Sequence, residues 1–384
     1  ARHLRAVSPP DGGTTSMKMN RSRLSIAVLA LAAVALAWKP TQGGAPVRPA
    51  VTASTLSTRD GALTVMTYNV EGLPWPIRLG RDAAFRRIGG RLAALRRRGD
   101  QPYVVMLQEA FTEEAKAIGR QAGYRFVVDG PGPDLHGSAA PTPADTAFLQ
   151  QASFFAGERS GKLLGSGLQI LSDYPVRSIR RMAFPDFACA GFDCLANKGA
   201  VLAMIDIPGS VVPVAVVDVH LNSRRASHVD DARSLYAFRR QMDALEAFLA
   251  ANLRSDTPLL LAGDFNVGPR PSRAAYFLAR LHDLGSHVRS GVHDALRSCA
   301  IAPTSCGGPL PADAAYSLKR ARDWEIVIPG SRMAMDVAGI SVPFGHNAAG
   351  DMLSDHIGYI ARYRIHPAVT GRGVRGRAGF ARAA

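Results

Sequence analysis

Short apolar runs rich in β-branched residues alternate with longer amphipathic segments along most of the chain. A period of two favours a strand, whereas apolar residues three or four apart favour a helix. Residues 130–160, rich in Pro, Gly and Ala, are predicted to form a loop. We predict strands at 63–70, 103–108, 167–172, 200–207, 212–221, 258–266, 324–328 and 356–365, and helices at 83–98, 112–121, 228–252 and 271–281. This order, without an internal repeat, predicts one domain with two packed β-sheets flanked by helices.

The start of the chain has the pattern of an export signal. Lys18, Arg21 and Arg23 precede an apolar run at 24–37 that ends in Ala-Leu-Ala. A basic region, a short apolar region and small residues are typical of a secretory signal peptide, although an uncleaved anchor stays open. We therefore divide the chain into four parts: an N-terminal extension with signal peptide (1–37), a linker (38–60), a catalytic domain (61–366) and a disordered basic tail (367–384). The signal peptide predicts a periplasmic or secreted protein.

Composition and charge limit the class of protein. Hydrophobic residues make up 47% of the chain and charged residues 20%, which is typical of a globular domain. The net charge is +15, and after the basic ends are set aside about +6 remains for the body. That charge suits a phosphate-bearing substrate or an anionic membrane, but it also fits an ordinary Arg-rich composition.

The four cysteines fit an oxidising compartment. Cys189 and Cys194 are five residues apart, and Cys299 and Cys306 are seven apart. Four cysteines allow three pairings, and free thiols are a further alternative. Because export is predicted, we expect two local disulfides rather than a metal cluster.

Polar residues follow several of the predicted strands at the point where each one ends. Taken singly, each would pass for a cap or a turn residue. Five such strand ends in one chain are harder to explain as capping, and neighbouring strands that end on the same side bring such groups together. These residues are Asn69, Gln108 with Glu109, His220 with Asn222, and Asp264 with Asn266, and a fifth pair, Asp355 with His356, is predicted to open the last strand.

These residue types indicate hydrolysis of a phosphoester. Carboxylate and amide oxygens are hard ligands that suit Mg²⁺, with Mn²⁺ or Ca²⁺ as alternatives. A divalent cation neutralises charge that develops on a phosphate. A histidine held by a carboxylate supplies acid–base catalysis near neutral pH.

The order of these motifs resembles the endonuclease/exonuclease/phosphatase, or DNase I-like, superfamily. Two further segments support the resemblance, GSGLQILSDYPV at 165–176 and Arg322-Asp323-Trp324, and together the motifs span about 61–365. The resemblance implies an α/β (α+β) fold, a four-layer α/β-sandwich of two packed β-sheets flanked by helices. At the usual tyrosine position of the late segment this chain has Trp324.

The resemblance also implies roles for the metal and proton-transfer groups. Glu109 corresponds to the principal metal ligand, with Asn69 in or beside its shell. His356 corresponds to the general acid or base, Asp355 supports the metal or His356, and Asp264 positions the nucleophile.

The remaining residues that the family implies contact the phosphate or hold other side chains. Asn266 and His220 would hydrogen-bond phosphoryl oxygens, and Asn222 would support His220. Asp323 would orient His356.

One segment resembles the neutral and bacterial sphingomyelinase branch of this superfamily. GFDCLANKGAVLA at 191–203 looks like its D-x-LA-x-KG segment, so Asp193 and Lys198 correspond to a switch pair near the phosphate. The alternative is a surface loop with a chance ion pair. Apolar residues at 73–76 and at 342–344 would suit a membrane interface, or equally two packed turns.

We therefore expect a monomeric, Mg²⁺-dependent phosphodiesterase that acts on sphingomyelin or another membrane phospholipid. A secreted nuclease or phosphatase of the same superfamily is the alternative, and its nucleic-acid substrate would account for the positive charge. Against it, no single predicted element combines a stripe of Arg and Lys with aromatic residues. A non-catalytic binding module is disfavoured, because Glu109 and His356 are both present.

Overall fold

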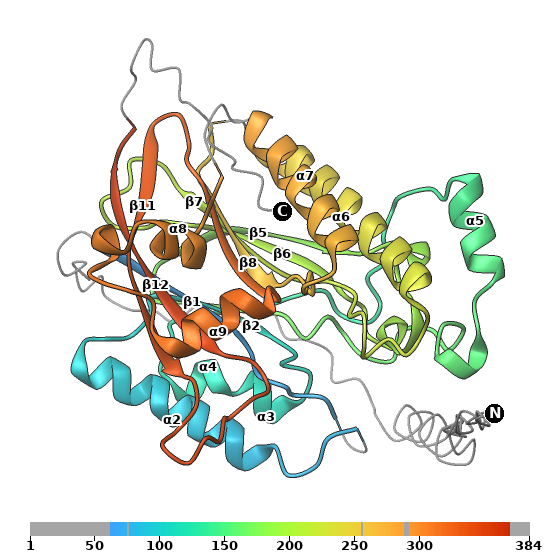
Figure 1. The fold of residues 1–384 in the computed structure, drawn as a ribbon, viewed down its shortest axis with the longest axis horizontal. Coiled ribbons are helices and arrows are strands. Elements are labelled where there is room, and N and C mark those ends of the chain that lie inside the picture. Colours follow the sequence, from blue (N-terminus) through green and yellow to red (C-terminus); the bar gives the residue numbers. More distant parts are fainter. Residues whose placement is uncertain (1–61, 75–76, 255, 288–291, 369–384) are drawn as a thin grey trace, which may run out of the picture. The chain divides into compact units, whose positions relative to one another are not determined.

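The computed structural model describes residues 62–368 except 75–76, 255 and 288–291 (Figure 1). The predicted signal peptide, the linker, the tail beyond residue 368 and the apolar pair Trp75-Pro76 lie outside the described residues.

The first sheet is built around the strand that follows the predicted linker. Its central pair, β1 and β2, is parallel, and its other neighbours are antiparallel. In spatial order its six strands are β11 (Met333–Phe344), β12 (Gly358–Pro367), β1 (Ala62–Asn69), β2 (Val104–Gln108), β4 (Gln169–Ser172) and β3 (Phe126–Asp129).

The second sheet has the same plan. Its central pair, β7 and β8, is parallel, and its other pairs are antiparallel. In spatial order its six strands are β5 (Val176–Ala183), β6 (Gly199–Ile205), β7 (Val214–His220), β8 (Leu259–Asp264), β10 (Asp323–Ile328) and β9 (His293–Asp294).

Alternate residues of the two sheets meet in a common core. Val65 and Met106 from the first sheet pack in the same buried cluster as Val216 and Leu260 from the second. The period of two along each strand places these residues on the inner face and their neighbours on the outer face. The outer faces carry separate apolar clusters, which include residues of the flanking helices.

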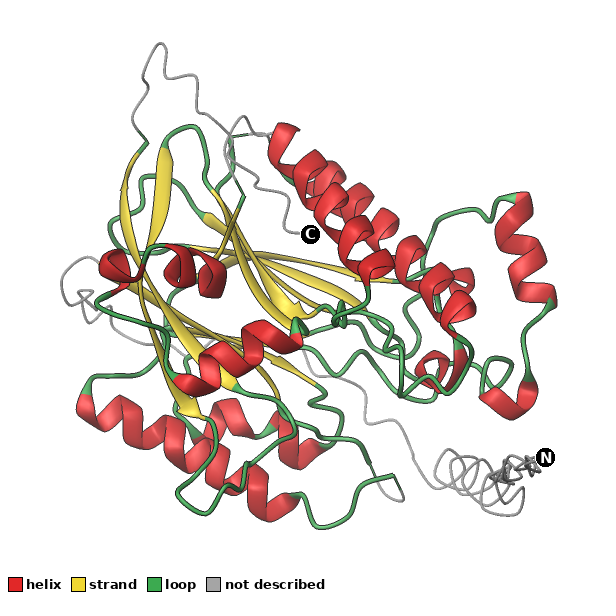
Figure 2. Cartoon of the chain, viewed as in Figure 1, coloured by secondary structure: helices red, strands yellow, loops and turns green. Residues whose placement is uncertain are grey.

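Helices cover both outer faces, so the predicted four-layer sandwich is confirmed (Figure 2). The first sheet is covered by α2 (Asp82–Arg98), α3 (Glu113–Lys116) and α4 (Ile118–Gln121), and the second by α6 (Asp231–Asn252) and α7 (Pro271–His287). Two short helices, α8 (Ala295–Ile301) and α9 (Ala312–Arg320), lie on the chain between β9 and β10. Among the described residues no helix has the length and apolar character needed to cross a bilayer.

Several local predictions were wrong. The predicted loop at 130–160 contains α5 (Pro143–Gln150), and the predicted helix at 112–121 is divided at Ala117 into α3 and α4. The apolar loop predicted at 342–344 belongs to β11, where Phe344 is only 2% exposed and stacks on Tyr68 at 4.9 Å. Phe344 is therefore a core residue and cannot form part of an exposed membrane lip, whereas Val342 and Pro343 are only partly buried.

The two local disulfides are confirmed. Cys189 is bonded to Cys194, and Cys299 to Cys306. The first disulfide lies in the loop that carries Asp193, so it restricts that loop beside β6.

Candidate active site

The strand registers bring the predicted polar residues to one end of the sandwich. Asn69 at the end of β1 lies opposite Gln108 of β2, and His220 at the end of β7 lies opposite Asp264 of β8. Asp264 in turn lies opposite Asp323, the first residue of β10. Their side chains share the inner face with the core residues, so they converge where the apolar core ends.

Glu109 and Asp264 are joined by the amide of Asn69. Its Nδ2 donates to Glu109 Oε1 at 3.0 Å and to Asp264 Oδ2 at 3.1 Å. Its Oδ1 is turned away and accepts from the backbone N–H of Glu71 at 3.0 Å. Asn69 therefore orients two carboxylates that could hold a metal ion.

Glu109 occupies an unusual backbone position in an environment that disfavours its charge. It has a φ of 57°, which turns the chain as β2 ends. Loss of hydration raises the pKa of Glu109 to about 7, although the Asn69 hydrogen bond opposes the shift. A cation bound to this carboxylate would offset the free-energy cost of burying its negative charge.

His356 is held by a buried carboxylate. Its Nδ1 lies 2.7 Å from Asp323 Oδ1, and its Nε2 lies 3.7 Å from Asp264 Oδ2. Burial alone would lower the pKa of His356, but Asp323 and Asp264 outweigh it and raise the pKa to about 10. Asp323 thus fixes the ring and leaves Nε2 directed at the site. Trp324 points to the other face of the sheet, where it packs on Phe277 at 4.7 Å, so its replacement of tyrosine leaves Asp323 in place.

The loop before β12 positions His356. Ser354 Oγ donates to the backbone oxygen of Asn69 at 2.6 Å and accepts from the N–H of His356 at 3.2 Å. Asp355 is half exposed, and its Oδ1 lies 3.9 Å from His356 Nε2. Residues 355–356 precede the strand rather than open it, since β12 begins at Gly358.

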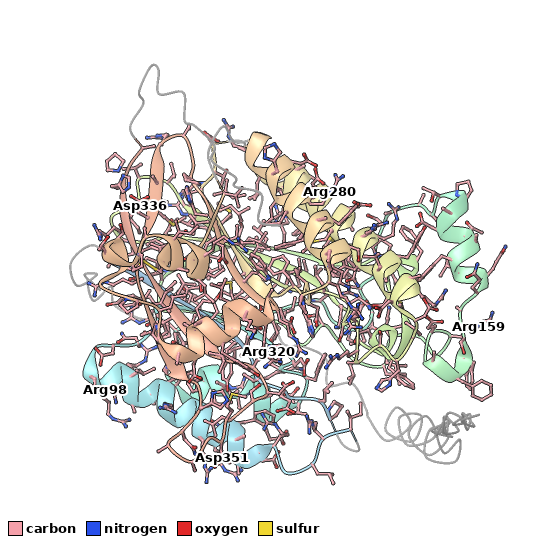
Figure 3. The ribbon with its side chains drawn as sticks, in the orientation of Figure 1. Arg98, Arg159, Arg280, Arg320, Asp336 and Asp351 are labelled. Atoms are coloured by element: carbon pink, nitrogen blue, oxygen red, sulfur yellow. A yellow bond between two sulfur atoms is a disulfide. The ribbon has the colours of Figure 1, made fainter. Side chains whose placement is uncertain are left out.

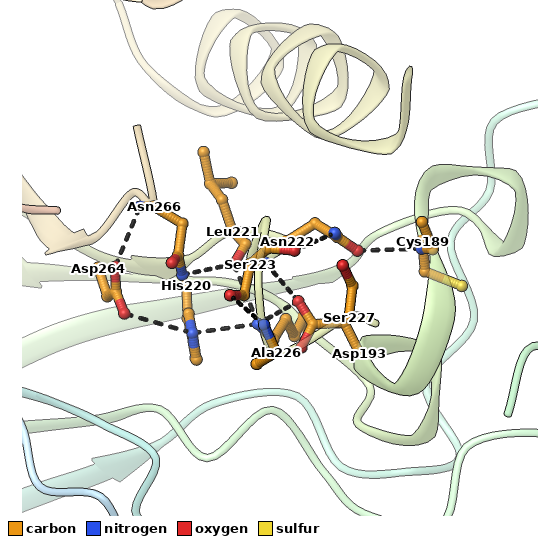
Figure 4. A network of polar contacts seen from close by, with 12 residues as sticks. Cys189, Asp193, His220, Leu221, Asn222, Ser223, Ala226, Ser227, Asp264 and Asn266 are labelled. Atoms are coloured by element: carbon orange, nitrogen blue, oxygen red, sulfur yellow. Dashed lines mark hydrogen bonds and ion pairs between the residues drawn. The ribbon is translucent and has the colours of Figure 1, made fainter. Parts of the chain in front are cut away.

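Lys198 connects the predicted switch pair to the site. Its Nζ donates to Asp193 Oδ2 at 2.9 Å and to the backbone oxygen of Leu221 at 3.0 Å, and lies 3.1 Å from His220 Nε2. Figure 4 labels these three partner residues, Asp193, Leu221 and His220. An ammonium group has donors only, so His220 Nε2 is the acceptor and its ring is neutral with the proton on Nδ1. Burial, with the nearby Lys198 charge, lowers the pKa of His220 well below its usual value, in agreement with this tautomer.

The two predicted asparagines hold the loops at the site. Asn266 Nδ2 donates to the backbone oxygen of Leu221 at 3.1 Å, and its N–H donates to Asp264 Oδ1 at 3.0 Å. Asn222 accepts from the N–H of Ala190 at 3.0 Å, so it fixes the disulfide loop. Within the described residues no hydrogen bond joins its side chain to His220, the contact that the family role implies.

Arg273 is a buried residue that the sequence analysis did not single out. It is 1% exposed and donates at 2.8 Å to the backbone oxygens of both Asn222 and Asn266. A second donor reaches the backbone oxygen of Ser234 at 3.1 Å. It thereby joins the loops after β7 and β8 to α6. As one arginine early in a helix, it had no motif to mark it.

The donor set fits a hard divalent cation. Glu109, His220 and Asp264 present atoms within 4.8 Å of one another, as do Asp264, Asp323 and His356. Lys198 already occupies His220 Nε2, so the carboxylates of Glu109 and Asp264 are the better ligands. Oxygen ligands of this kind are preferred by Mg²⁺.

The chain belongs to the endonuclease/exonuclease/phosphatase family, whose model matches residues 66–356. Members of this family hydrolyse phosphoester bonds. The family match agrees with the convergence of buried carboxylates and histidines at the end of the two sheets.

Several solved structures are similar to this chain. Beta toxin from Staphylococcus aureus shares 19% identity with a TM-score of 0.50 over 78% of this chain and 99% of that chain. Sphingomyelinase C from Streptomyces griseocarneus shares 20% sequence identity with a TM-score of 0.49, over 78% of this chain and 99% of that chain. An endonuclease/exonuclease/phosphatase from Beutenbergia cavernae DSM 12333 shares 18% sequence identity with a TM-score of 0.48, over 79% of this chain and 71% of that chain. No curated protein sequence matches significantly.

Proposed function

We propose that this protein is a metal-dependent phosphodiester hydrolase. The observation that carries the proposal is the convergence of Glu109 and Asp264 with a histidine that Asp323 holds at 2.7 Å. The ligand set favours Mg²⁺, with Mn²⁺ or Ca²⁺ as alternatives. A bound cation would supply charge neutralisation at the phosphoryl oxygens.

The side chains at the site have separate roles in the proposed reaction. Asp264, whose pKa is raised by burial, orients the attacking water through a carboxylate oxygen 3.7 Å from His356 Nε2. His356 acts through Nε2, because its Nδ1 is engaged by Asp323, and either accepts the proton of the attacking water or donates a proton to the leaving-group oxygen. Lys198 places a positive charge beside the phosphate, and Asn266 and His220 line the same region. Asn69 orients the carboxylates of Glu109 and Asp264.

A membrane phospholipid such as sphingomyelin is the first candidate substrate. It is supported by the resemblance of 191–203 to the sphingomyelinase segment and by the ion pair between Lys198 and Asp193, which is almost fully buried. A chance surface pair would be solvent-exposed and would not contact His220. On this proposal the protein is exported and acts as a monomer.

A nucleic acid is the second candidate substrate. It is favoured by a group of basic residues that lines a hollow next to Asn266 and Asp355. Phosphate backbones bind such surfaces through electrostatic attraction.

The substrate is tested by comparing sphingomyelin, phosphatidylcholine and plasmid DNA side by side, each with and without Mg²⁺. Metal-dependent release of phosphocholine supports a lipid phosphodiesterase, and metal-dependent nicking supports a nuclease. Hydrolysis of none of them, nor of the small diester bis(4-nitrophenyl) phosphate, would refute the proposed activity.

A further inference from the structure

Two carboxyl side chains lie deep between the sheets, in the row of residues directly behind the active site. Carboxyl groups are usually exposed, as those of Asp336 and Asp351 are (Figure 3), whereas Asp218 and Glu325 are 0% exposed. In the second sheet both lie opposite Ala262, Asp218 from β7 and Glu325 from β10. Burying a carboxyl group is costly, and neither acid has a role in the proposed reaction.

The active-site residues form the next row of the same sheet. His220 and Asp323 both lie opposite Asp264, each two residues along its strand from one of the buried acids. Side chains two residues apart on a strand point to the same face. On the far side of each acid, the next residue on this face belongs to the apolar core, Val216 on β7 and Val327 on β10. The two acids therefore lie where the apolar core changes to the active site.

Each acid accepts a hydrogen bond from the opposite sheet. Gln108 Nε2 of β2 donates to Asp218 Oδ1 at 2.7 Å. The Tyr363 hydroxyl of β12 donates to Glu325 Oε1 at 2.6 Å. Both bonds are buried, and each joins a strand of the first sheet to a strand of the second. We call them the two cross-sheet bonds.

The active site is divided between the same two sheets. Glu109 and Asn69 belong to the strand ends of the first sheet, and Asp264 and Asp323 to those of the second. The core cluster that the sheets share consists of apolar residues, and apolar contact has no preferred direction. A hydrogen bond is directional, so it fixes a donor on one sheet against an acceptor on the other.

We propose that the two cross-sheet bonds set the position of one sheet on the other, and thereby the separation of Glu109 from Asp264, the two carboxylates proposed to hold the cation. A buried polar pair can fix one arrangement of an apolar interface in this way. Gln108 directly precedes Glu109, so the first bond acts on the neighbouring residue. The inference rests on the proposed metal-dependent hydrolysis and adds four positioning residues to it.

A role in stability alone is the alternative, and apolar replacement separates the two. When one partner of a buried hydrogen bond is removed, the other is left unsatisfied and the fold is destabilised. When both partners are replaced by apolar groups of similar shape, stability is close to neutral or increased. Such a double variant still lacks the directional bond, so a positioning role is lost while stability is kept.

The test compares Tyr363→Phe with the double variant Glu325→Met, Tyr363→Phe in the full chain. Stability is measured by the midpoint of urea denaturation, and Mn²⁺ binding to the metal-free protein by electron paramagnetic resonance of the free ion. Tyr363→Phe should lower the urea midpoint, and the double variant should restore it. In both variants Mn²⁺ should bind about tenfold more weakly, as when other groups that orient metal ligands are removed. Gln108→Met, which removes the other cross-sheet bond, should weaken Mn²⁺ binding in the same way.

Tyr124→Phe is the matched control. The Tyr124 hydroxyl donates to the backbone oxygen of Pro102 at 2.7 Å in a buried bond, and Tyr124 packs with the helices that cover the first sheet. This variant also loses one buried phenolic hydroxyl, so it should lower the urea midpoint as Tyr363→Phe does. It should bind Mn²⁺ as the parent does, because its bond does not join the two sheets.

Equal losses of Mn²⁺ affinity in Tyr363→Phe and Tyr124→Phe would overturn the inference. So would a double variant that regains both the urea midpoint and the Mn²⁺ affinity of the parent. Hydrolysis of bis(4-nitrophenyl) phosphate by the parent reports the proposed function separately. If the parent and the cross-sheet variants bind Mn²⁺ and hydrolyse that diester equally well, only the positioning role fails. A parent that does neither would refute the proposed function and the inference with it.

Discussion

Two opposing influences act on the protonation of His356. Burial disfavours the imidazolium, whereas Asp323 and Asp264 favour it, and the carboxylates prevail. Each carboxylate comes from a strand end of the second sheet, so the charge at His356 depends on the pairing of β8 with β10.

Replacing His356 tests its role in proton transfer. His356→Ala should lower kcat for a phosphodiester about 10²- to 10⁴-fold, because a positioned acid–base group contributes that much. The measurement is steady-state hydrolysis of bis(4-nitrophenyl) phosphate, with thermal unfolding to show that the variant is folded.

Asp323→Asn serves as the positioning control. It keeps the hydrogen bond to Nδ1 but removes the charge, so kcat should fall less than in His356→Ala and the pH profile should shift. An unchanged rate in His356→Ala would remove His356 from the mechanism.

The proximity of individual side chains was predictable where a family motif marks them. Glu109, Asp264, Asp323 and His356 come together as the motifs imply. The sequence did not predict that His220 Nε2 accepts a hydrogen bond. Its donor is Lys198, which is 22 residues away in sequence and lies beside His220 because of the position of β6 in the sheet. Spacing carries no information about such a contact between strands.

At the scale of elements, Arg273 fixes the two loops that bear Asn222 and Asn266. Arg273→Met should lower the free energy of unfolding by about 2–4 kcal/mol, because buried backbone oxygens lose their donor. Urea denaturation measures this change.

The folded fraction of that variant should also turn over more slowly, because Asn266 would lose its fixed position. Ser234→Ala, which removes one acceptor of Arg273 and leaves its bonds to both loops, is the milder control and should keep its rate. Equal stability and rate in Arg273→Met and the parent would show that the loops are held by other contacts.

The helix α5 is anchored by one buried carboxylate. Asp145 accepts from Arg240 Nε at 2.8 Å and from the Tyr236 hydroxyl at 2.7 Å, and its carboxylate accepts from the N–H of Thr142, the capping residue. Burial alone would raise the pKa of Asp145, but these bonds outweigh it and lower the pKa to about 2.

Asp145→Asn should therefore cost about 1–3 kcal/mol of stability at neutral pH. Since the folded pKa lies below the usual value, the ionised carboxylate stabilises the fold above about pH 4, and its contribution is lost as the pH falls towards 2. Urea titrations at pH 7 and pH 3 measure the difference, with exposed Asp134→Asn as the control. A difference that grows on acidification would contradict this assignment.

The elements missed from the sequence have physical reasons. β5 carries three arginines on a half-exposed edge, so its pattern lacks the apolar run used to recognise strands. β11 changes register twice along its pairing with β12, which interrupts its period of two. For α5 a signal was present, because Thr142 and Asp145 form a capping box, but the Pro- and Gly-rich surroundings favoured a loop.

At the scale of the whole molecule, the two sheets were predictable, and the hollow lined by basic residues next to Asn266 and Asp355 was not. Alternating apolar residues identify strands that are buried between layers, and polar strand ends identify the edge where a site forms. The hollow is lined by the loops after β7 and β8, by the end of α9 with the turn that follows, and by the loop before β12, and the first three lie together because β8 pairs with β7 and β10. A basic residue in one of these loops looks like any other surface residue.

On the proposed mechanism, Glu109 and Asp264 bind a divalent cation, and phosphodiester hydrolysis depends on it. The most direct measurement is the rate of bis(4-nitrophenyl) phosphate hydrolysis by the chain after treatment with excess EDTA, and again after Mg²⁺ is restored in excess. We predict that the rate falls to background in EDTA, returns with Mg²⁺, and does not return in Glu109→Gln. Full activity in excess EDTA would contradict the account.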